Sequence, residues 1–148
     1  MKSFCTLHIR SSSHQKLPSE LFRPSVKMDL EFKDLCAPDV LESRIRVSKK
    51  LGRDFPELPR YCWRISSESY VTGDDIEEHL EWIFHLLPSD SRLCDLLSGD
   101  FDYSISTFWV GNGTGGGVLI SVRMAELLSK HRVALGVGFY LDEVVGTD

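Results

Sequence analysis

The spacing of apolar residues between positions 74 and 88 constrains the fold more than any other feature of this sequence. Four of these residues recur at intervals of four, three and four: Ile76, Leu80, Ile83 and Leu87. Such spacing places their side chains on one face of an α-helix. Asp74 is predicted to cap this helix, because Glu77 three residues later completes a capping box. Pro88 is predicted to end it.

Strand patterns flank this helix on both sides. Runs rich in aromatic and β-branched residues predict strands at 60–66, 103–110, 118–120 and 133–141. Gly136 and Gly138 in the last run indicate a bulge or close backbone packing. The glycine-rich segment 111–117 is predicted to be the loop between the second and third strands.

Two further helices are predicted from caps that precede apolar residues. Ser89 is expected to cap a short helix with three leucines, Leu93, Leu96 and Leu97. Ser121 is expected to cap a longer helix with four inward side chains, Met124, Leu127, Leu128 and His131.

From position 60 onward the main elements therefore run strand, helix, strand, strand, helix, strand. This is the split βαβ order of ferredoxin-like domains, which are α+β proteins with an antiparallel sheet and helices on one face. The alternating segment 4–10 is predicted to be a strand added at an edge of that sheet. The chain is thus expected to form a single domain, with an irregular region at 1–59 and a split βαβ core at 60–142.

The irregular region gives weaker patterns. A short helix is predicted at 17–22 and a strand at 28–32, and the two prolines of 54–60 indicate a loop. Segment 40–51 remains open between helix and strand. Leu41 and Ile45 are four residues apart as in a helix, but Ile45 and Val47 alternate as in a strand.

Composition excludes several classes of protein. Of 148 residues, 42% are hydrophobic and 26% charged, which is typical of a globular domain and excludes wholesale disorder. The formal net charge of −5 argues against a general nucleic-acid binder, which needs a basic surface. No run approaches the ~18 apolar residues of a membrane span.

The cysteines indicate the compartment. Cys5, Cys36, Cys62 and Cys94 are spread along the chain without a Cys-x-x-Cys pair, which favours reduced thiols over a disulfide framework or a zinc site. His8 and Arg10 interrupt the apolar character of the first ten residues, so no signal peptide is predicted. A cytoplasmic location is expected.

Several short segments of the chain resemble a known pattern: 61–67 (YCWRISS), 76–80 (IEEHL), 86–88 (LLP), 119–121 (LIS), 125–128 (AELL) and 138–140 (GFY). Together they resemble a bacterial family catalogued as domain of unknown function 4279, over roughly the C-terminal 60% of the chain. The family has no established catalytic residues. The resemblance implies a small bacterial domain, and by analogy an immunity protein that accompanies a toxin.

The outward face of the helix at 74–87 collects the candidate partner-binding residues: Glu77, Glu78, Glu81, Trp82 and His85. Glu81 and His85 are one turn apart, so the carboxylate is expected to favour the charged imidazole. Such a pair suits general base catalysis or metal binding. The helix lacks a second histidine at metal-binding spacing, however, so a solvated face is favoured and no metal, cofactor or catalytic residue is predicted. Trp82 favours contact with a partner, although packing under the N-terminal arm explains it equally well.

Other motifs favour ordinary structural roles. The glycines of 111–117 match G-x-G-x-x-G, but a strand pattern follows them and nucleotide binding is rejected. His79 is expected to be a hydrogen-bonded residue at the edge of the core, and His131 to cap the end of its own helix. The basic residues Arg44, Arg46, Lys49, Lys50 and Arg53 are expected to form a solubilising face.

Three functions are consistent with these observations. The first is a non-enzymatic protein-interaction domain, in its specific form an immunity-like protein whose acidic helix face and Trp82 cover a basic patch on a toxin. The second is a small-ligand-binding protein or enzyme that uses the open face of the sheet, where Trp63, Tyr103 and Trp109 are candidates. The third is a homodimer formed through a sheet edge.

Overall fold

The computed structural model describes residues 2–54, 59–111 and 117–141. Its elements in chain order are β1 (Ser3–Ser11), β2 (Glu31–Asp34), α1 (Pro38–Leu51), β3 (Tyr61–Ser66), α2 (Ile76–His85), α3 (Leu93–Leu96), β4 (Phe101–Gly111), α4 (Val122–His131) and β5 (Ala134–Leu141). The interior of the predicted 111–117 loop, most of the 54–60 loop and the end of the predicted core at 142 lie outside the described residues.

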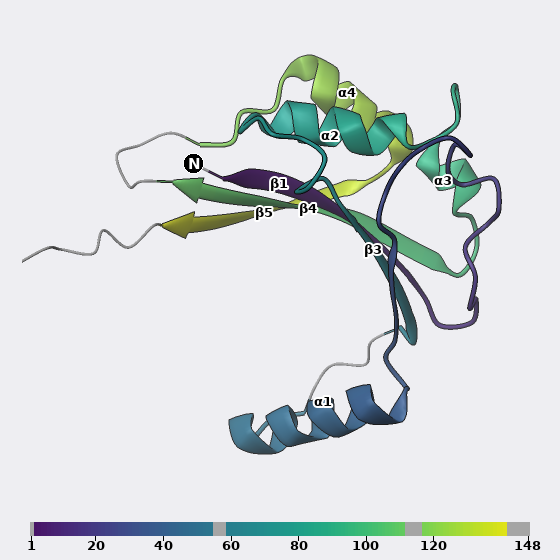
Figure 1. Ribbon diagram of the computed structural model, residues 1–148, viewed down its shortest axis with the longest axis vertical. Coiled ribbons are helices and arrows are strands. Elements are labelled where there is room, and N and C mark those ends of the chain that lie inside the picture. Colours follow the sequence, from purple (N-terminus) through teal and green to yellow (C-terminus); the bar gives the residue numbers. More distant parts are fainter. Residues whose placement is uncertain (1, 55–58, 112–116, 142–148) are drawn as a thin grey trace, which may run out of the picture.

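The strands form one mixed sheet in the order β2-β3-β1-β4-β5 (Figure 1). β1 pairs antiparallel with both β3 and β4, and β2 pairs antiparallel with β3. β4 and β5 are parallel, joined through α4. The α+β class is confirmed. The expectation of a wholly antiparallel sheet is wrong, and the ferredoxin-like split order is not confirmed.

β1 lies in the middle of the sheet, so its predicted place at an edge is wrong. The alternation that identified this strand decides which of its sides is buried, but it does not specify the neighbouring strands. Cys5, Leu7 and Ile9 on one side of β1 are fully buried, and a strand with such a side is best covered when neighbours flank it on both edges.

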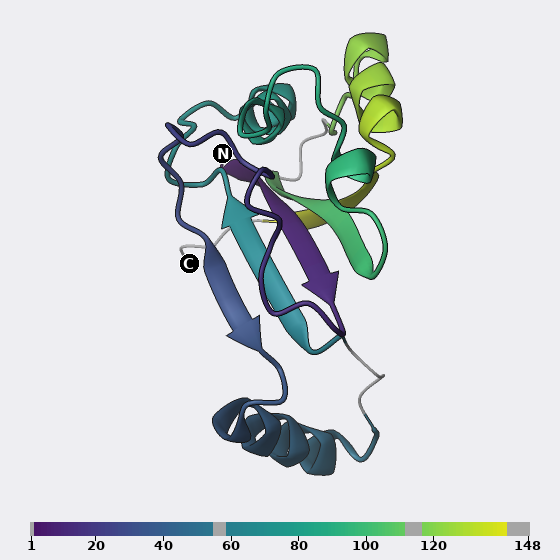
Figure 2. The ribbon, with the colours of Figure 1, turned by 90° about the vertical axis from the view of Figure 1, so that its right-hand side faces the viewer.

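The helices α2 and α4 cover one face of the sheet, and the hydrophobic core lies beneath them (Figures 1 and 2). The predicted apolar face of α2 is buried: Ile76, Leu80, Ile83 and, just beyond the helix, Leu87. The cap of α2 is Asp75 and not Asp74, because the Asp75 carboxylate accepts the Glu77 N–H at 2.9 Å. Ser121 caps α4 as predicted and accepts the Met124 N–H.

Three local predictions are wrong. Segment 17–22 forms turns and not a helix. Segment 118–120 was predicted to be a strand, but it pairs with no other strand among the described residues. The short helix α3 begins after Arg92 and not after Ser89.

Segment 40–51, for which the sequence did not decide between helix and strand, belongs to helix α1. Pro38 occupies its first turn, where its missing N–H costs nothing. Gly52 ends it in the left-handed conformation, with φ of 66°, which glycine adopts without strain. The helix lies away from α2 and α4, across the curved sheet (Figures 1 and 2).

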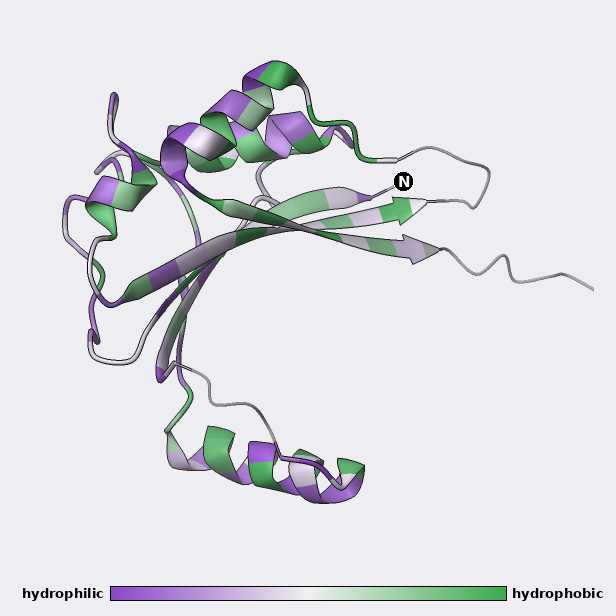
Figure 3. Cartoon of the chain, turned by 180° about the vertical axis from the view of Figure 1, so that it is seen from behind, coloured by the Kyte–Doolittle hydropathy of each residue, from purple (hydrophilic) through white to green (hydrophobic). Residues whose placement is uncertain are grey.

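α1 buries none of its residues. Its exposed apolar side chains are Leu41, Ile45, Val47 and Leu51, each between 39% and 54% accessible. Figure 3 shows these hydrophobic segments alternating with hydrophilic ones around the helix. The helix therefore keeps an apolar stripe without a covering surface in this chain.

Candidate functional site

The predicted acidic face of α2 is partly used by contacts with α4. Glu77 accepts a hydrogen bond from the Ser121 backbone N–H at 2.5 Å. This bond and the nearby Arg123 guanidinium lower the pKa of the Glu77 carboxyl below its ordinary value, although burial opposes them. Glu81 forms an ion pair with Arg123 at 2.5 Å. Both carboxylates therefore join α2 to the start of α4.

The other three predicted partner-binding residues are placed differently. Trp82 stacks on Tyr70 in the segment after β3, with ring centroids 4.8 Å apart. Glu78 and His85 are exposed. The structure gives Glu81 the partner Arg123, in place of the predicted His85. The five residues share one helix, but only part of their polar chemistry faces solvent.

The opposite face of the sheet carries no helix over its centre and is lined by polar side chains. The even-numbered residues of β1, including Thr6, His8 and Arg10, point to this open face. Ser104 and Ser106 on β4 and Arg64 on β3 lie beside them in the register. The alternation in the sequence of β1 predicts this polar side.

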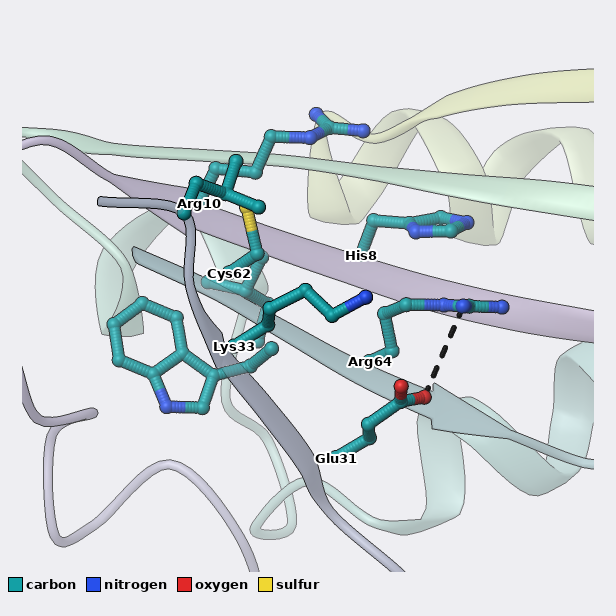
Figure 4. Close-up of a pocket in the computed structure, with 9 residues that line it drawn as sticks. His8, Arg10, Glu31, Lys33, Cys62 and Arg64 are labelled. Atoms are coloured by element: carbon teal, nitrogen blue, oxygen red, sulfur yellow. Dashed lines mark ion pairs between the residues drawn. The ribbon is translucent and has the colours of Figure 1, made fainter. Parts of the chain in front are cut away.

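A pocket of about 190 Å³ lies on the open face, across β1, β2 and β3. Its polar lining consists of His8, Arg10, Glu31, Lys33, Cys62 and Arg64, and its apolar lining of Ile9, Leu35 and Trp63. Figure 4 shows the polar side chains projecting from three adjacent strands, with the Lys33 ammonium group directed toward Arg64. The pocket thus gathers three cations from segments far apart in the chain.

The electrostatic environment of this pocket is positive. Burial lowers the pKa of His8, and the charges of Arg10 and Arg64 lower it further, so the ring is neutral at pH 7. His8 Nε2 shares a hydrogen bond of 2.7 Å with Ser106 Oγ. Burial raises the pKa of the Cys62 thiol, although Arg10 and Lys33 oppose it. Cys62 is therefore a thiol and not an activated nucleophile.

Sequence reasoning did not find this pocket. The aromatic residues expected on the open face, Trp63, Tyr103 and Trp109, lie instead on the side of the sheet that α2 and α4 cover. That expectation is wrong because strand register decides the face, and register follows from the buried neighbours Ile65 and Ile105. The alternation of His8 and Arg10 was available, but their neighbour Arg64 is more than 50 residues away in the chain.

The buried histidines have structural roles. His79 is fully buried; its Nε2–H donates to the Gly73 carbonyl at 2.7 Å, and its Nδ1 shares a hydrogen bond of 2.7 Å with Ser67 Oγ. The expected hydrogen bonding of His79 is confirmed, although the residue lies in the core and not at its edge. Ser67 in turn binds the Cys5 backbone, which links α2 to β1.

His131 corrects a prediction, because it does not cap its own helix with its side chain. Its Nδ1 accepts the Leu93 N–H at 3.0 Å, at the start of α3, and its ring stacks on Phe84 with centroids 4.6 Å apart. The acceptor role requires an unprotonated Nδ1. Burial and the charges of Lys130 and Arg92 lower the pKa of His131, which keeps the ring neutral.

Neither metal binding nor a reactive thiol is supported by the described residues. Within 2–54, 59–111 and 117–141, no group of three or more His, Cys, Asp or Glu side chains is arranged to hold a metal ion. Burial raises the pKa of Cys5 to about 11, and its Sγ lies 3.5 Å from Thr107 Oγ1. Of the basic residues expected to form a solubilising face, Arg46, Lys49, Lys50 and Arg53 are exposed on or just after α1, whereas Arg44 is half-buried.

Comparison of the chain with protein-family models, curated proteins and solved structures found no match. In the described part of the chain, no helix has the length and apolar character needed to cross a membrane.

Proposed function

We propose that the protein is a non-enzymatic protein-interaction domain and that α1 is its principal docking element. The observation that carries this proposal is that a 14-residue helix with four exposed apolar side chains buries none of them. In most proteins the stability of a helix of this length comes from packing of its apolar stripe. A partner that covers α1 supplies that packing.

The position of the side chains indicates the kind of partner. At 100° per residue, Val47 and Leu51 share one side of α1, and Leu41 and Ile45 lie next to them. Arg46, Lys49 and Lys50 gather on the opposite side. This arrangement fits the binding of a helix in a groove, where apolar anchors enter the groove and charges approach its rim. The partner we propose is a protein with an apolar groove and an acidic rim.

The apolar side chains of α1 supply part of the free energy that binding requires. Full burial of one Leu, Ile or Val side chain contributes about 1.5–3 kcal/mol relative to exposure. The four side chains are 39–54% exposed, so a partner has roughly half of that contribution to gain at each.

An immunity-like role remains the second candidate. It rests on exposed Glu78 and His85 on α2 and on the resemblance to a bacterial family of small domains. In this version the acidic face of α2 covers a basic patch on a toxin. Glu77 and Glu81 already bind residues at the start of α4, so fewer carboxylates are available to a partner. This favours docking through α1 over the immunity-like role. The two surfaces lie on opposite sides of the sheet (Figure 1), so separate variants test them.

The test is affinity capture from the native host with three forms of the protein: wild type, Ile45→Glu and Glu78→Lys. We expect a protein partner that binds wild type and Glu78→Lys but not Ile45→Glu, because a charge at position 45 is costly to bury in an apolar groove. Loss with Glu78→Lys alone supports the immunity-like candidate. Equal capture by all three forms contradicts both.

Self-association is tested separately by sedimentation of the purified protein over a range of concentrations. If wild type dimerises and Ile45→Glu does not, the partner of α1 is a second copy of this chain and not a different protein.

A further inference from the structure

The pocket on the open face is built from two rows of side chains that cross three strands. In the register, His8 lies opposite Arg64, and Arg64 lies opposite Glu31. Two residues along each strand, the next row consists of Arg10, Cys62 and Lys33. Residues two apart in a strand point to the same face and are about 6.5–7 Å apart. All six side chains therefore border one small volume.

The charges in this lining do not balance. Arg10, Lys33 and Arg64 are cationic, and Glu31 is the one carboxylate in the lining of the pocket. Glu31 pairs with Arg64 at 3.8 Å, a long contact. Asp102 pairs with Arg10 at 3.2 Å but is 74% exposed and lies outside the lining. No ion pair to Lys33 is found within the described residues, so positive charge remains uncompensated.

The surroundings limit where an anion fits. On the other side of Arg64 a second hollow, of about 160 Å³, is lined by Asp29, Glu31 and Glu68, which repel anions. The positive region is therefore confined to the side of Arg64 that faces Arg10 and Lys33. Leu35 adds an apolar wall there.

We infer that this pocket binds a small phosphate monoester, with the phosphate group between Arg10, Lys33 and Arg64 and the organic group against Leu35. Guanidinium groups form paired hydrogen bonds with phosphate oxygens, and an ammonium group supplies a mobile point charge. A volume of about 190 Å³ exceeds the need of a bare phosphate ion, yet it is smaller than the roughly 300–1,000 Å³ of pockets for drug-sized ligands. The site is separate from α1 and does not depend on the proposed function.

The first experiment measures binding of phenyl phosphate, inorganic phosphate and sulfate by titration calorimetry at low salt. We expect saturable 1:1 binding of the ester, with a dissociation constant at or below about 1 mM. The ester is expected to bind more tightly than either inorganic ion, because only the ester reaches the apolar wall. Equal affinity for all three would show an adventitious anion site, and absence of saturation would also overturn the proposal.

Variants locate the site. Arg64→Gln and Lys33→Gln are each expected to weaken binding by about tenfold or more, since hydrogen bonds to charged groups are the stronger ones. Arg46→Gln is the matched control, because it removes the same charge from exposed α1. If Arg46→Gln weakens binding as much as Arg64→Gln, the effect is that of net charge and the pocket is not the site.

The pKa of His8 gives a second measure of binding, which a general effect of a variant on folding would not change. A bound phosphate dianion stabilises the charged imidazole, so the ester is expected to raise the pKa of His8 in an NMR titration. His14, exposed after β1, is the internal reference. An unchanged His8 pKa at saturating ester contradicts the placement. Intact ester binding by Ile45→Glu separates this result from any failure of the α1 proposal.

Discussion

At the scale of single residues, His131 connects the end of α4 to the start of α3 through a hydrogen bond that only its neutral form accepts. The pKa of His131 is lowered in the folded protein, whereas in the unfolded chain it is about 6.5. Below about pH 6.5 the unfolded state therefore takes up a proton that the native state does not. The stability that neutral His131 contributes at neutral pH is therefore lost as the pH falls from about 6.5 toward the pKa of His131 in the native state.

We expect His131→Gln to reduce this loss, because the glutamine amide oxygen accepts the Leu93 N–H without titrating. The measurement is the free energy of unfolding from urea denaturation at pH 7.5 and pH 5.5. Some pH dependence is expected to remain in the variant, since the pKa of His8 is lowered as well. His85→Gln, at an exposed position of α2, is the control. An identical difference between the two pH values in wild type and His131→Gln would contradict this role.

His79 makes a different prediction, because it holds two polar groups in the core. His79→Leu leaves Ser67 Oγ without its ring partner and the Gly73 carbonyl without its donor. Ser67 Oγ keeps its hydrogen bonds to the Cys5 backbone, so the Gly73 carbonyl is the group left unpaired. Such a group costs about 1–3 kcal/mol, and we expect a destabilisation of that size. Chemical denaturation at pH 7.5 measures it. His85→Leu on the same helix is expected to change stability by less than about 0.5 kcal/mol; a similar cost for both would rule out a specific effect.

The sequence predicted residue roles where the evidence was local. The Ser121 cap and the buried face of α2 depend on residues three or four positions apart, and both are confirmed. The partner of Glu81 was missed because Arg123 is on another helix. The function of the predicted partner-binding residues stays a prediction.

At the scale of elements, α1 differs from α2 in how it obtains its stability. Both are amphipathic, but α2 buries Ile83 and α1 leaves Ile45 exposed. We expect Ile45→Ala to change the free energy of unfolding by less than about 0.5 kcal/mol, because alanine forms helix well and no packing is lost. Ile83→Ala is expected to cost about 2–5 kcal/mol.

Urea denaturation of the two alanine variants tests this contrast. Similar destabilisation by both substitutions would mean that α1 packs on its own chain, and it would remove the basis of the docking proposal. Since both substitutions replace isoleucine by alanine within a helix, differences of intrinsic helix propensity cancel.

Local patterns predicted elements well only where caps and periodicity agreed. In segment 40–51 the alternation of Ile45 and Val47 opposed the helical spacing, and the pattern left the choice open. Pro38 and Gly52 favour the helix. Segment 118–120 has the alternation of a strand but no neighbour in the described sheet, so a correct local pattern gave the wrong element.

At the scale of the whole molecule, the central strand β1 is the most protected part of the sheet and α1 the least. The amides of β1 are enclosed by β3 and β4 on both edges. We expect the amides of Leu7 and Ile9 to exchange with solvent only through global unfolding. Amides of α1 are expected to exchange at least ~100-fold faster, because the helix opens without disturbing the core. Hydrogen exchange followed by NMR measures both, and equal protection would contradict this division.

The topology was the level that sequence reasoning predicted least. Alternation identified β1 as a strand but gave no information on its neighbours, so its central position was missed. The parallel pairing of β4 with β5 follows from the crossover through α4. Segment 118–120 is not a strand of the described sheet. β4 therefore pairs directly with β5, in parallel, and the sheet is mixed and not antiparallel as predicted.

The central position of β1 also has a consequence for how the chain folds. Leu7 pairs with Ile65 on one side and with Ile105 on the other. Both edges of this strand can therefore pair only after segments much later in the chain have been synthesised. Closure of such long loops costs entropy before any pairing is gained. Folding is therefore expected to be slow for a chain of this size. In a nascent chain that ends before β4, the edge of β1 that β4 later covers is unpaired and accessible to chaperones and to aggregating neighbours.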